Sequence, residues 1–131
     1  MGQIMSTKTF DVMRHLSSIA VLHEKASLKK ALDMMNEKQI GTACFVNESG
    51  ELIGVLTDGD LRRVILHKQS PLPALLVTDA LSFGSITPIS VQSNTNIETV
   101  REIMDSKCIW DVPVVNSENL LIGLVHRHNV G

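Results

Sequence analysis

Two stretches of the sequence decide the fold: LIGVLTDGD at residues 52–60 and LIGLVHRHN at residues 121–129. The second repeats the first after 69 residues, and the same offset aligns residues 23–60 with residues 92–129 without a gap. Self-similarity at a fixed period indicates that each copy encodes one supersecondary unit. The identical pairs in this alignment are Met35/Met104, Lys38/Lys107, Ile40/Ile109, Val46/Val115, Asn47/Asn116, Leu52/Leu121, Ile53/Ile122 and Gly54/Gly123.

Each copy begins with a short extended segment and a helix. Residues 18–21 and residues 87–91 are the predicted extended segments. Ser27 and Asn96 stand where they would cap the next helix by accepting hydrogen bonds from its free N–H groups. After each of these two residues, apolar side chains recur at helical spacing, which favours an amphipathic helix.

Two strands follow each helix, and polar, Asn-containing turns separate them. In the first copy a further helix is expected from Asp60 to about Lys68, and the proline-rich stretch at residues 70–73 ends it. The predicted strands are aliphatic runs at residues 43–46 and 52–56 in the first copy, and at residues 112–115 and 121–125 in the second.

These elements predict an α/β fold made of two β-α-β-β-α units that pack with pseudo-two-fold symmetry. The first unit is expected at residues 10–70 and the second at residues 78–131. The sequence stops at Gly131, where the last helix of the second unit would begin, so the second unit is expected to lack that helix. One such unit is small for an independent core, so the two are expected to bury a shared interface.

The composition is that of an ordinary globular domain. The 131 residues are 44% hydrophobic and 20% charged, which argues against disorder. The net charge is −2 and the only tight basic cluster is Arg62-Arg63, whereas duplex-binding domains present a strongly basic face. No apolar run approaches the ~18 residues of a membrane span. We therefore expect neither a nucleic-acid nor a membrane partner.

The cysteines and the N-terminus favour a cytoplasmic location. Cys44 and Cys108 lie far apart in the sequence among apolar residues, and we expect both to be reduced core thiols. The chain start lacks the charged and apolar stretches of a signal peptide. Residues 1–6 carry no pattern and are expected to be a disordered start or a remnant of cloning.

The segment from Gly54 to Asp60 carries the clearest chemistry. It ends a strand and starts a helix, and the free N–H groups of a helix start attract anions such as phosphate. Thr57 offers a hydroxyl to the same anion, Asp60 can accept from two sugar hydroxyls, and Arg62 matches phosphate geometry. Together these residues suit a phosphorylated ribose or sugar. On a purely structural interpretation, Asp60 is the helix N-cap and Thr57 only the end of a strand.

The tandem repeat, with Gly-x-x-Thr-x-x-Asp after the third strand, resembles the CBS domain pair, also called a Bateman module, over nearly the whole chain. The resemblance implies that Thr57 and Asp60 contact the phosphate and ribose of a regulatory nucleotide such as AMP, ADP or ATP, with no cofactor required. It also implies that the base lies against the first strand and the start of the second. The nucleotide-binding residues expected on this basis are Ser18, Ile19, Ala20, Thr42, Ala43, Thr57, Asp58, Asp60 and Arg62.

The second copy departs from this pattern. His126 stands where Thr57 does in the first copy, and Asn129 stands where Asp60 does. Asn keeps an acceptor for ribose, but the lost hydroxyl and the bulky imidazole weaken the case for phosphate binding. Trp110 either stacks a base at a second cleft or is a partly buried core or interface residue. A weaker second site is expected from Thr87, Trp110, Asp111, His126 and Asn129.

Two further stretches narrow the resemblance. Residues 57–63 and the final His-x-His at residues 126–128 look like the CBS pair of arabinose-5-phosphate isomerase-type sugar-phosphate isomerases. The pair that precedes some sugar nucleotidyltransferase domains is the second choice. No catalytic domain of either kind is present, so we expect a regulatory module and not an enzyme. The resemblance also implies an attached or partner enzyme domain and a homodimer.

Two alternative functions stay open at this point. One is a dimerisation scaffold that binds no ligand. The other is metal binding by His126 and His128, but no third ligand is evident beside them and no metal site is expected.

Overall fold

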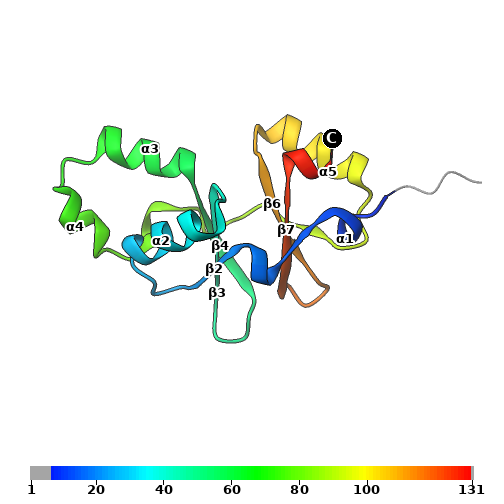
Figure 1. Ribbon diagram of the computed structural model, residues 1–131, viewed down its shortest axis with the longest axis horizontal. Helices are drawn as coiled ribbons and strands as arrows, with labels where there is room; N and C mark the ends of the chain where they lie inside the picture. Colours follow the sequence, from blue (N-terminus) through cyan, green and yellow to red (C-terminus); the bar gives the residue numbers. More distant parts are fainter. Residues whose placement is uncertain (1–6, 131) are drawn as a thin grey trace, which may run out of the picture.

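The computed structural model describes residues 7–130 and shows two lobes, one for each copy of the repeat (Figure 1). Residues 1–6, expected to be a disordered start, and Gly131 lie outside the described residues. Each lobe has one small sheet with helices beside it, which confirms the α/β fold predicted from the repeat.

The first lobe has a three-stranded sheet in which a helix connects two parallel neighbours and the third strand returns antiparallel. This is a β-α-β crossover unit closed by a hairpin. Its sheet consists of β2 (Ala20–His23), β3 (Thr42–Val46) and β4 (Leu52–Thr57), in that order, and its helices are η1 (Leu16–Ser18), α2 (Leu28–Lys38), α3 (Asp58–His67), α4 (Leu72–Leu76) and η2 (Ala80–Phe83).

The second lobe repeats this arrangement and adds one strand from the start of the chain. A single 3-10 turn stands where α3 begins in the first lobe. The sheet order is β1 (Arg14–His15), β7 (Leu121–His126), β6 (Asp111–Val115) and β5 (Val91–Gln92), and the helices are α1 (Thr9–Val12), α5 (Ile97–Lys107) and η3 (Arg127–Asn129).

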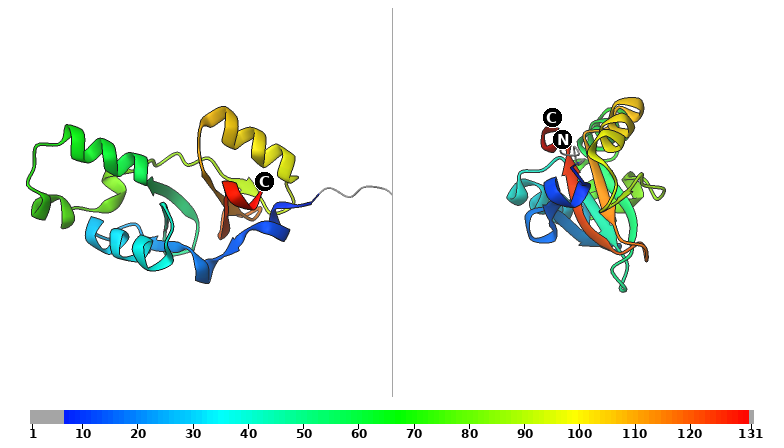
Figure 2. Two further views of the ribbon diagram at one scale, coloured as in Figure 1. Left: turned by 45° about the horizontal axis from the view of Figure 1, so that its top comes forward. Right: turned by 90° about the vertical axis from the view of Figure 1, so that its right-hand side faces the viewer.

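The segments that lead into the two lobes exchange places. In β1, Arg14 pairs with Leu124 of the second lobe, although the chain continues from β1 into the first lobe. In return, Ser85 exchanges two backbone hydrogen bonds with Val55 of the first lobe, of 2.8 and 3.0 Å, before the chain enters β5. Figures 1 and 2 show the blue N-terminal segment lying along the second lobe. The exchange fastens the lobes together and decides which residues reach the cleft between them.

Carbonyl groups outside the two helices accept hydrogen bonds from the first residues of α2 and α5. The N–H of Leu28 donates to the carbonyl of Thr78 at 2.8 Å, and the N–H of Ile97 donates to Thr7 at 3.0 Å. Ser27 caps α2 as predicted, because its hydroxyl accepts from the N–H of Lys30 at 3.2 Å. The prediction for Asn96 is wrong: it occupies the N-cap position of α5, but its side chain accepts from Lys8 instead of from the helix.

Helix α3 begins two residues earlier than predicted. Thr57 is its N-cap, and the Thr57 hydroxyl accepts from the N–H of Asp60 at 3.2 Å. Asp60 is therefore the third helical residue, and its carboxylate accepts from the N–H of Thr57 at 2.9 Å, which completes a capping box. The interpretation of Asp60 as the N-cap is corrected. The stretch at 70–73 ends α3 but also starts α4, with Pro71 as its N-cap.

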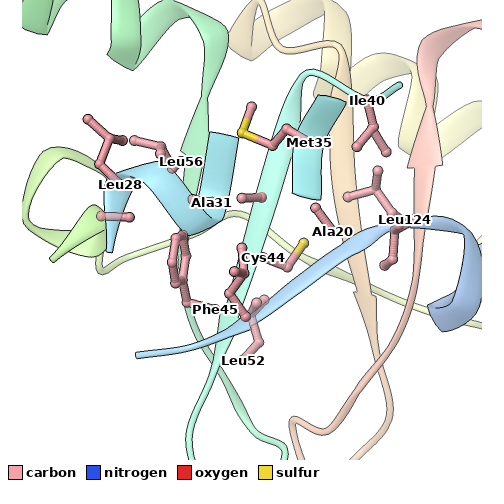
Figure 3. Packing of buried hydrophobic residues seen from close by; sticks show 14 of the residues in the cluster. Ala20, Leu28, Ala31, Met35, Ile40, Cys44, Phe45, Leu52, Leu56 and Leu124 are labelled. Atoms are coloured by element: carbon pink, nitrogen blue, oxygen red, sulfur yellow. The ribbon is translucent and has the colours of Figure 1, made fainter. Parts of the chain in front are cut away.

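Two clusters of buried aliphatic side chains form the core. The larger one belongs mainly to the first lobe, around the fully buried Phe45, and it extends across the lobe interface to include Leu124 of β7 (Figure 3). The smaller one fills the second lobe around Val100 and Met104. Because the larger cluster takes residues from both copies of the repeat, burial of apolar surface holds the two lobes together.

The two cysteines differ in their environment. Cys44 in β3 is 1% exposed, as predicted, but Cys108 is exposed at the C-terminal end of α5 in left-handed backbone conformation, with φ of 55°. The prediction that both are core thiols is therefore wrong for Cys108. Within residues 7–130, no helix combines the length and the apolar character needed to cross a bilayer.

Candidate functional site

A cleft of about 770 Å³ lies between the lobes. One wall comes from the first lobe, at the end of β4 and the start of α3. The other comes from the second lobe, at the end of α5, the first half of β6 and the end of β7. The lining residues are Gly41, Thr42, Val55, Thr57, Asp58, Gly59, Asp60, Arg62, Arg63, Ser85, Thr87, Pro88, Ile89, Lys107, Cys108, Ile109, Trp110, Asp111, Pro113 and His126.

The first-lobe wall presents the capping box of α3 to the cleft. The Thr57 hydroxyl oxygen accepts from the backbone of α3, which leaves its proton free to donate to a ligand. The Asp60 carboxylate accepts from Thr57 and, through its other oxygen, from the Arg63 guanidinium at 2.5 Å. The Arg63 side chain is 59% exposed, so this ion pair is weak and the guanidinium is free to turn toward a bound anion.

Gly41 leaves room in this wall for the side chain of Asp58. A Cβ at Gly41 would lie 2.6 Å from a carboxylate oxygen of Asp58, so only glycine lets Asp58 take its present place at the start of α3. The N–H of Asp58 donates to the carbonyl of Gly41 at 3.0 Å. In the second lobe, the N–H of Arg127 donates to the carbonyl of Trp110 at 2.8 Å in the equivalent place. The two lobes therefore share this backbone hydrogen bond but differ in the side chain at the acceptor residue. That residue is a glycine in the first lobe and a tryptophan in the second.

The second-lobe wall presents Trp110, whose side chain is a flat apolar surface. Trp110 is 61% exposed, which excludes a place in the core and leaves base stacking and an interface as the interpretations of this residue. Cys108 ends α5 in left-handed conformation, and this turn carries the chain from Lys107 around to Trp110. An exposed indole in a cleft is suited to stack on a planar ring such as a nucleobase.

A hydrogen-bonded chain crosses the bottom of the cleft from one lobe to the other. The Thr42 hydroxyl donates to one carboxylate oxygen of Asp111 at 3.0 Å, and the other oxygen of Asp111 lies 2.8 Å from Nδ1 of His126. The Asp111 side chain is only 7% exposed, and that of His126 is 24% exposed. Thr42 and Asp111 are equivalent positions of the repeat, so this contact marks the pseudo-two-fold axis.

Burial also affects the pKa of the Cys44 thiol, which feels the charge of Asp111. Burial raises the pKa of Cys44 to about 12, and the negative charge of Asp111 adds to the effect. Cys44 is therefore protonated and unreactive at neutral pH. The prediction of a reduced core thiol fits its place in β3.

The structure gathers residues that the sequence divided between two sites. The first set was expected to form a nucleotide site and the second a weaker, separate site, but members of both sets line the same cleft. The expectation of two separate clefts for these residues is corrected. The predicted residues that meet there are Thr42, Thr57, Asp58, Asp60 and Arg62 from the first set, and Thr87, Trp110, Asp111 and His126 from the second.

The remaining predicted residues lie elsewhere. Ile19, Ala20 and Ala43 are buried in the first-lobe core, Ser18 is exposed in η1, and none of them lines the cleft. Asn129 accepts from the N–H of His126 at 3.0 Å as part of a capping box and also lies outside the cleft. The reason is the exchange of leading segments, which brings residues 85–89 rather than residues 18–20 in front of Thr57.

Sequence reasoning missed several lining residues, among them Ser85, Pro88, Ile89, Lys107 and Ile109. The repeat itself held a signal for part of this set, since residues 87–89 are equivalent to residues 18–20. Within residues 7–130, no cluster of three or more His, Cys, Asp or Glu side chains is arranged to hold a metal ion.

A comparison with protein families assigns the fold. The CBS domain model matches residues 3–67 and 83–130, which is most of the chain. The chain belongs to the CBS domain family. It is a pair of CBS domains, as the repeat predicted.

This CBS pair is similar in sequence to parts of larger proteins and in fold to solved CBS structures. It is 32% identical over 124 residues to an uncharacterized protein of Rickettsia prowazekii, covering 95% of this chain and 37% of that protein. It is 28% identical over 130 residues to the arabinose 5-phosphate isomerase KdsD of Yersinia pestis, covering 99% and 38%. The CBS pair thus spans less than two-fifths of these curated relatives. CBSX2 of Arabidopsis thaliana, solved in complex with AMP, has a TM-score of 0.81 and 23% identity, covering 94% of this chain and 92% of CBSX2.

Proposed function

We propose that this CBS pair binds an adenine nucleotide, or a related nucleotide or sugar phosphate, in the cleft between its lobes and reports occupancy to an enzyme domain. The observation that carries the proposal is the composition of that single cleft. It joins the Thr57–Asp60 capping box of the first lobe to the exposed Trp110 of the second.

The first-lobe wall suits the ribose and phosphate of such a ligand. Asp60 retains free lone pairs for ribose hydroxyls beside its bonds to Thr57 and Arg63. The Thr57 hydroxyl and the N-terminal end of α3, a helix of 10 residues, favour a phosphate oxygen. Arg62 and Arg63 line the same wall and supply positive charge.

The second-lobe wall suits the base. Trp110 offers a ring face, and Pro88, Ile89 and Ile109 provide apolar surface in the same cleft. Stacking of a base on an exposed aromatic ring contributes about 1–3 kcal/mol in other nucleotide-binding proteins. The solved complex of CBSX2 with AMP, a protein of the same fold, supports an adenine nucleotide as the first ligand to test.

Transmission follows from a ligand that touches both lobes. Such a ligand binds best to one relative placement of the lobes, so it shifts the population toward that placement. An attached domain that contacts the two lobes would experience the shift. The likeness to arabinose 5-phosphate isomerase KdsD supports a sugar-phosphate isomerase as that domain. A sugar nucleotidyltransferase is our second choice, and we place the protein in the cytoplasm.

A dimerisation scaffold is the second candidate function, and one surface favours it. Four large apolar side chains on and after α3 are between 58% and 78% exposed: Ile65, Leu66, Leu72 and Val77. Burial of this surface against a second copy would give a homodimer. The two functions are compatible, but only the sensor responds to nucleotide.

The proposal is tested by thermal unfolding of the chain with AMP, ADP, ATP and phosphorylated or CMP-linked sugars. A nucleotide at ~100 times its dissociation constant is expected to add ~2.7 kcal/mol to the free energy of unfolding. Asp60→Ala is expected to abolish this gain and to cost about 0.5–2 kcal/mol through loss of the capping box.

Asn129→Ala is the matched control. Asn129 makes the same backbone hydrogen bond in the second lobe but lies outside the cleft, so this variant is expected to lose comparable stability and to keep the full response to ligand. If none of these compounds shifts the unfolding of the wild-type chain, the sensor proposal is wrong and the scaffold function is favoured.

A further inference from the structure

One titratable group in the cleft has no counterpart on the other side of the pseudo-two-fold axis. His126 occupies the position of Thr57, and its partner Asp111 occupies the position of Thr42. Both threonines carry no charge, whereas an imidazole can accept a proton and become a cation. The chain has therefore placed an acid–base pair on one wall of a cleft whose other wall is neutral at these two positions.

The hydrogen bonds fix how the imidazole is presented. Both oxygens of the nearly buried Asp111 carboxylate already accept, one from Thr42 and one from Nδ1 of His126 at 2.8 Å. An ionised carboxylate only accepts, so Nδ1 carries the proton of the neutral ring. The contact with Asp111 uses Nδ1, and His126 lines the cleft. Nε2 is thus the ring atom that remains to take a second proton.

We propose that His126 binds the anionic group of the cleft's ligand through Nε2 and takes up one proton from solvent when it does so. The inference rests on the proposed function, since it assumes that the nucleotide phosphate that lies against Thr57 and the start of α3 also reaches His126 on the opposite wall of the cleft. With His126 neutral, the Asp111 carboxylate opposes a phosphate nearby. With the second proton on Nε2, the imidazolium cancels that charge and donates a hydrogen bond to the phosphate.

The other charged groups around His126 do not replace it. In the same cleft, Lys107 of α5 and Arg62 and Arg63 of α3 are all exposed, and Asp58 and Asp60 offset two of their three positive charges. On η3, the ring of His128 lies 4.8 Å from that of His126, and Arg127 pairs with Asp105 at 3.5 Å. From β1, Arg14 and His15 pair with residues 124 and 123 rather than with the end of β7.

The sign of the pH dependence follows directly. A phosphate beside the ring favours the imidazolium in the complex relative to the free protein. The affinity gain is therefore fully present at acidic pH and is lost as the pH rises through the range in which the complex gives up its proton. One whole proton taken up corresponds to a fall in affinity of about tenfold per pH unit.

The test is calorimetric titration of AMP into the wild-type chain and into His126→Asn, between pH 6 and 8, in two buffers of different ionisation enthalpy. Asn keeps a donor toward Asp111 but cannot take up a proton. Near pH 6 the phosphate of AMP still carries a proton that it can pass to His126, so proton uptake from solvent is compared above pH 7, where the phosphate is almost fully ionised. The wild-type chain is expected to take up more protons per AMP, and its affinity is expected to fall more steeply with pH.

Two controls make the result specific. His128→Asn removes a neighbouring imidazole that does not line the cleft and is expected to keep the wild-type proton uptake. Adenosine, which lacks the phosphate, is expected to show no difference between wild type and His126→Asn. If His126→Asn does not fold, as judged by circular dichroism, His126→Gln takes its place.

The outcomes separate this inference from the proposed function. If AMP binds and the proton uptake is equal in wild type and His126→Asn, His126 is not the proton-linked group and the inference is overturned, while the nucleotide site stands. If the wild-type chain binds no nucleotide at any pH, both are overturned.

Discussion

The ends of β4 and β7 have the same backbone geometry and different chemistry. At the end of β4, the Asp60 carboxylate accepts from the N–H of Thr57 at 2.9 Å, and at the end of β7 the Asn129 amide oxygen accepts from the N–H of His126 at 3.0 Å. The first box opens a helix of 10 residues that borders the cleft, and the second opens a 3-10 turn of 3 residues. The repeat has therefore kept the hydrogen bonds that shape the backbone and changed the side chains that meet a ligand.

The same division holds at other equivalent positions. Gln39 and Cys108 both end a helix in left-handed conformation, with φ of 53° and 55°. Gly50 and Asn119 both take positive φ in the turns of the two hairpins. The environments of Gln39 and Cys108 nevertheless differ, because only Cys108 lines the cleft. One asymmetric cleft, with a wall from each lobe, is the result.

The largest expected difference between the lobes is in the core. Phe45 is fully buried in the larger cluster, and its equivalent Val114 is fully buried in the smaller one. Phe45→Ala is expected to lower the free energy of unfolding by about 3–5 kcal/mol, and Val114→Ala by roughly 1–3 kcal/mol, since fewer buried carbon atoms are removed. Urea unfolding measures both. Equal losses would contradict the view that the first lobe holds the main core.

A smaller difference is expected between Gly54 and Gly123, the two glycines that the leading segments pass closely. A Cβ at Gly54 would lie 2.7 Å from the carbonyl oxygen of Ser85, and one at Gly123 would lie 2.5 Å from that of Arg14. Gly54→Ala and Gly123→Ala are each expected to cost about 1–3 kcal/mol, because a backbone must shift. Only Gly54→Ala moves the segment that leads to Thr87 in the cleft, so only this variant is expected to weaken AMP binding in calorimetry.

If Gly54→Ala and Gly123→Ala weakened AMP binding equally, the exchanged segment at residues 85–89 would not be part of the site.

The smallest effect is a difference in reactivity between the two thiols, which does not involve the stability of the fold at neutral pH. Burial raises the pKa of Cys44 to about 12 from an ordinary value of 9.0, whereas Cys108 is exposed beside the cleft. A thiol reagent at pH 8 is expected to modify Cys108 in the folded chain and Cys44 only after unfolding. Bound AMP is expected to slow the reaction of Cys108.

The same thiol gives a pH dependence of stability. The unfolded chain releases the Cys44 proton near pH 9.0, while the folded chain holds it to about 12. The stability contributed by the protonated thiol is therefore complete below pH 9 and is lost as the pH rises toward 12. Cys44→Ala is expected to flatten this loss in alkaline unfolding experiments. Rapid modification of Cys44 in the folded chain would contradict its burial.

The repeat and its periodicity were sufficient to predict the fold. Aliphatic runs bounded by polar turns located β3, β4, β6 and β7, and Ser27 located the start of α2. The boundaries of α3 were less accurate, because a Thr followed three residues later by Asp forms a capping box in which the Thr, not the Asp, is the N-cap. The pattern of residues 57–60 contained that signal.

The division of the site was not predictable from either copy alone. Local pattern assigns residues 18–20 to the first lobe and residue 110 to a second site, and nothing in those segments encodes their crossing. The crossing follows from long-range pairing, of Arg14 with Leu124 and of Ser85 with Val55, which depends on how the lobes pack. The close approach at Gly54 and Gly123 was the one local sign that another backbone passes there.

The central claim is that the two lobes form one nucleotide cleft, and an NMR titration of the ¹⁵N-labelled chain with AMP tests it most directly. The backbone amides of residues 57–60 and the indole N–H of Trp110 are expected to shift together along one saturation curve. Shifts confined to residues 18–20, separate curves for the two lobes, or no shifts at all would contradict a shared site.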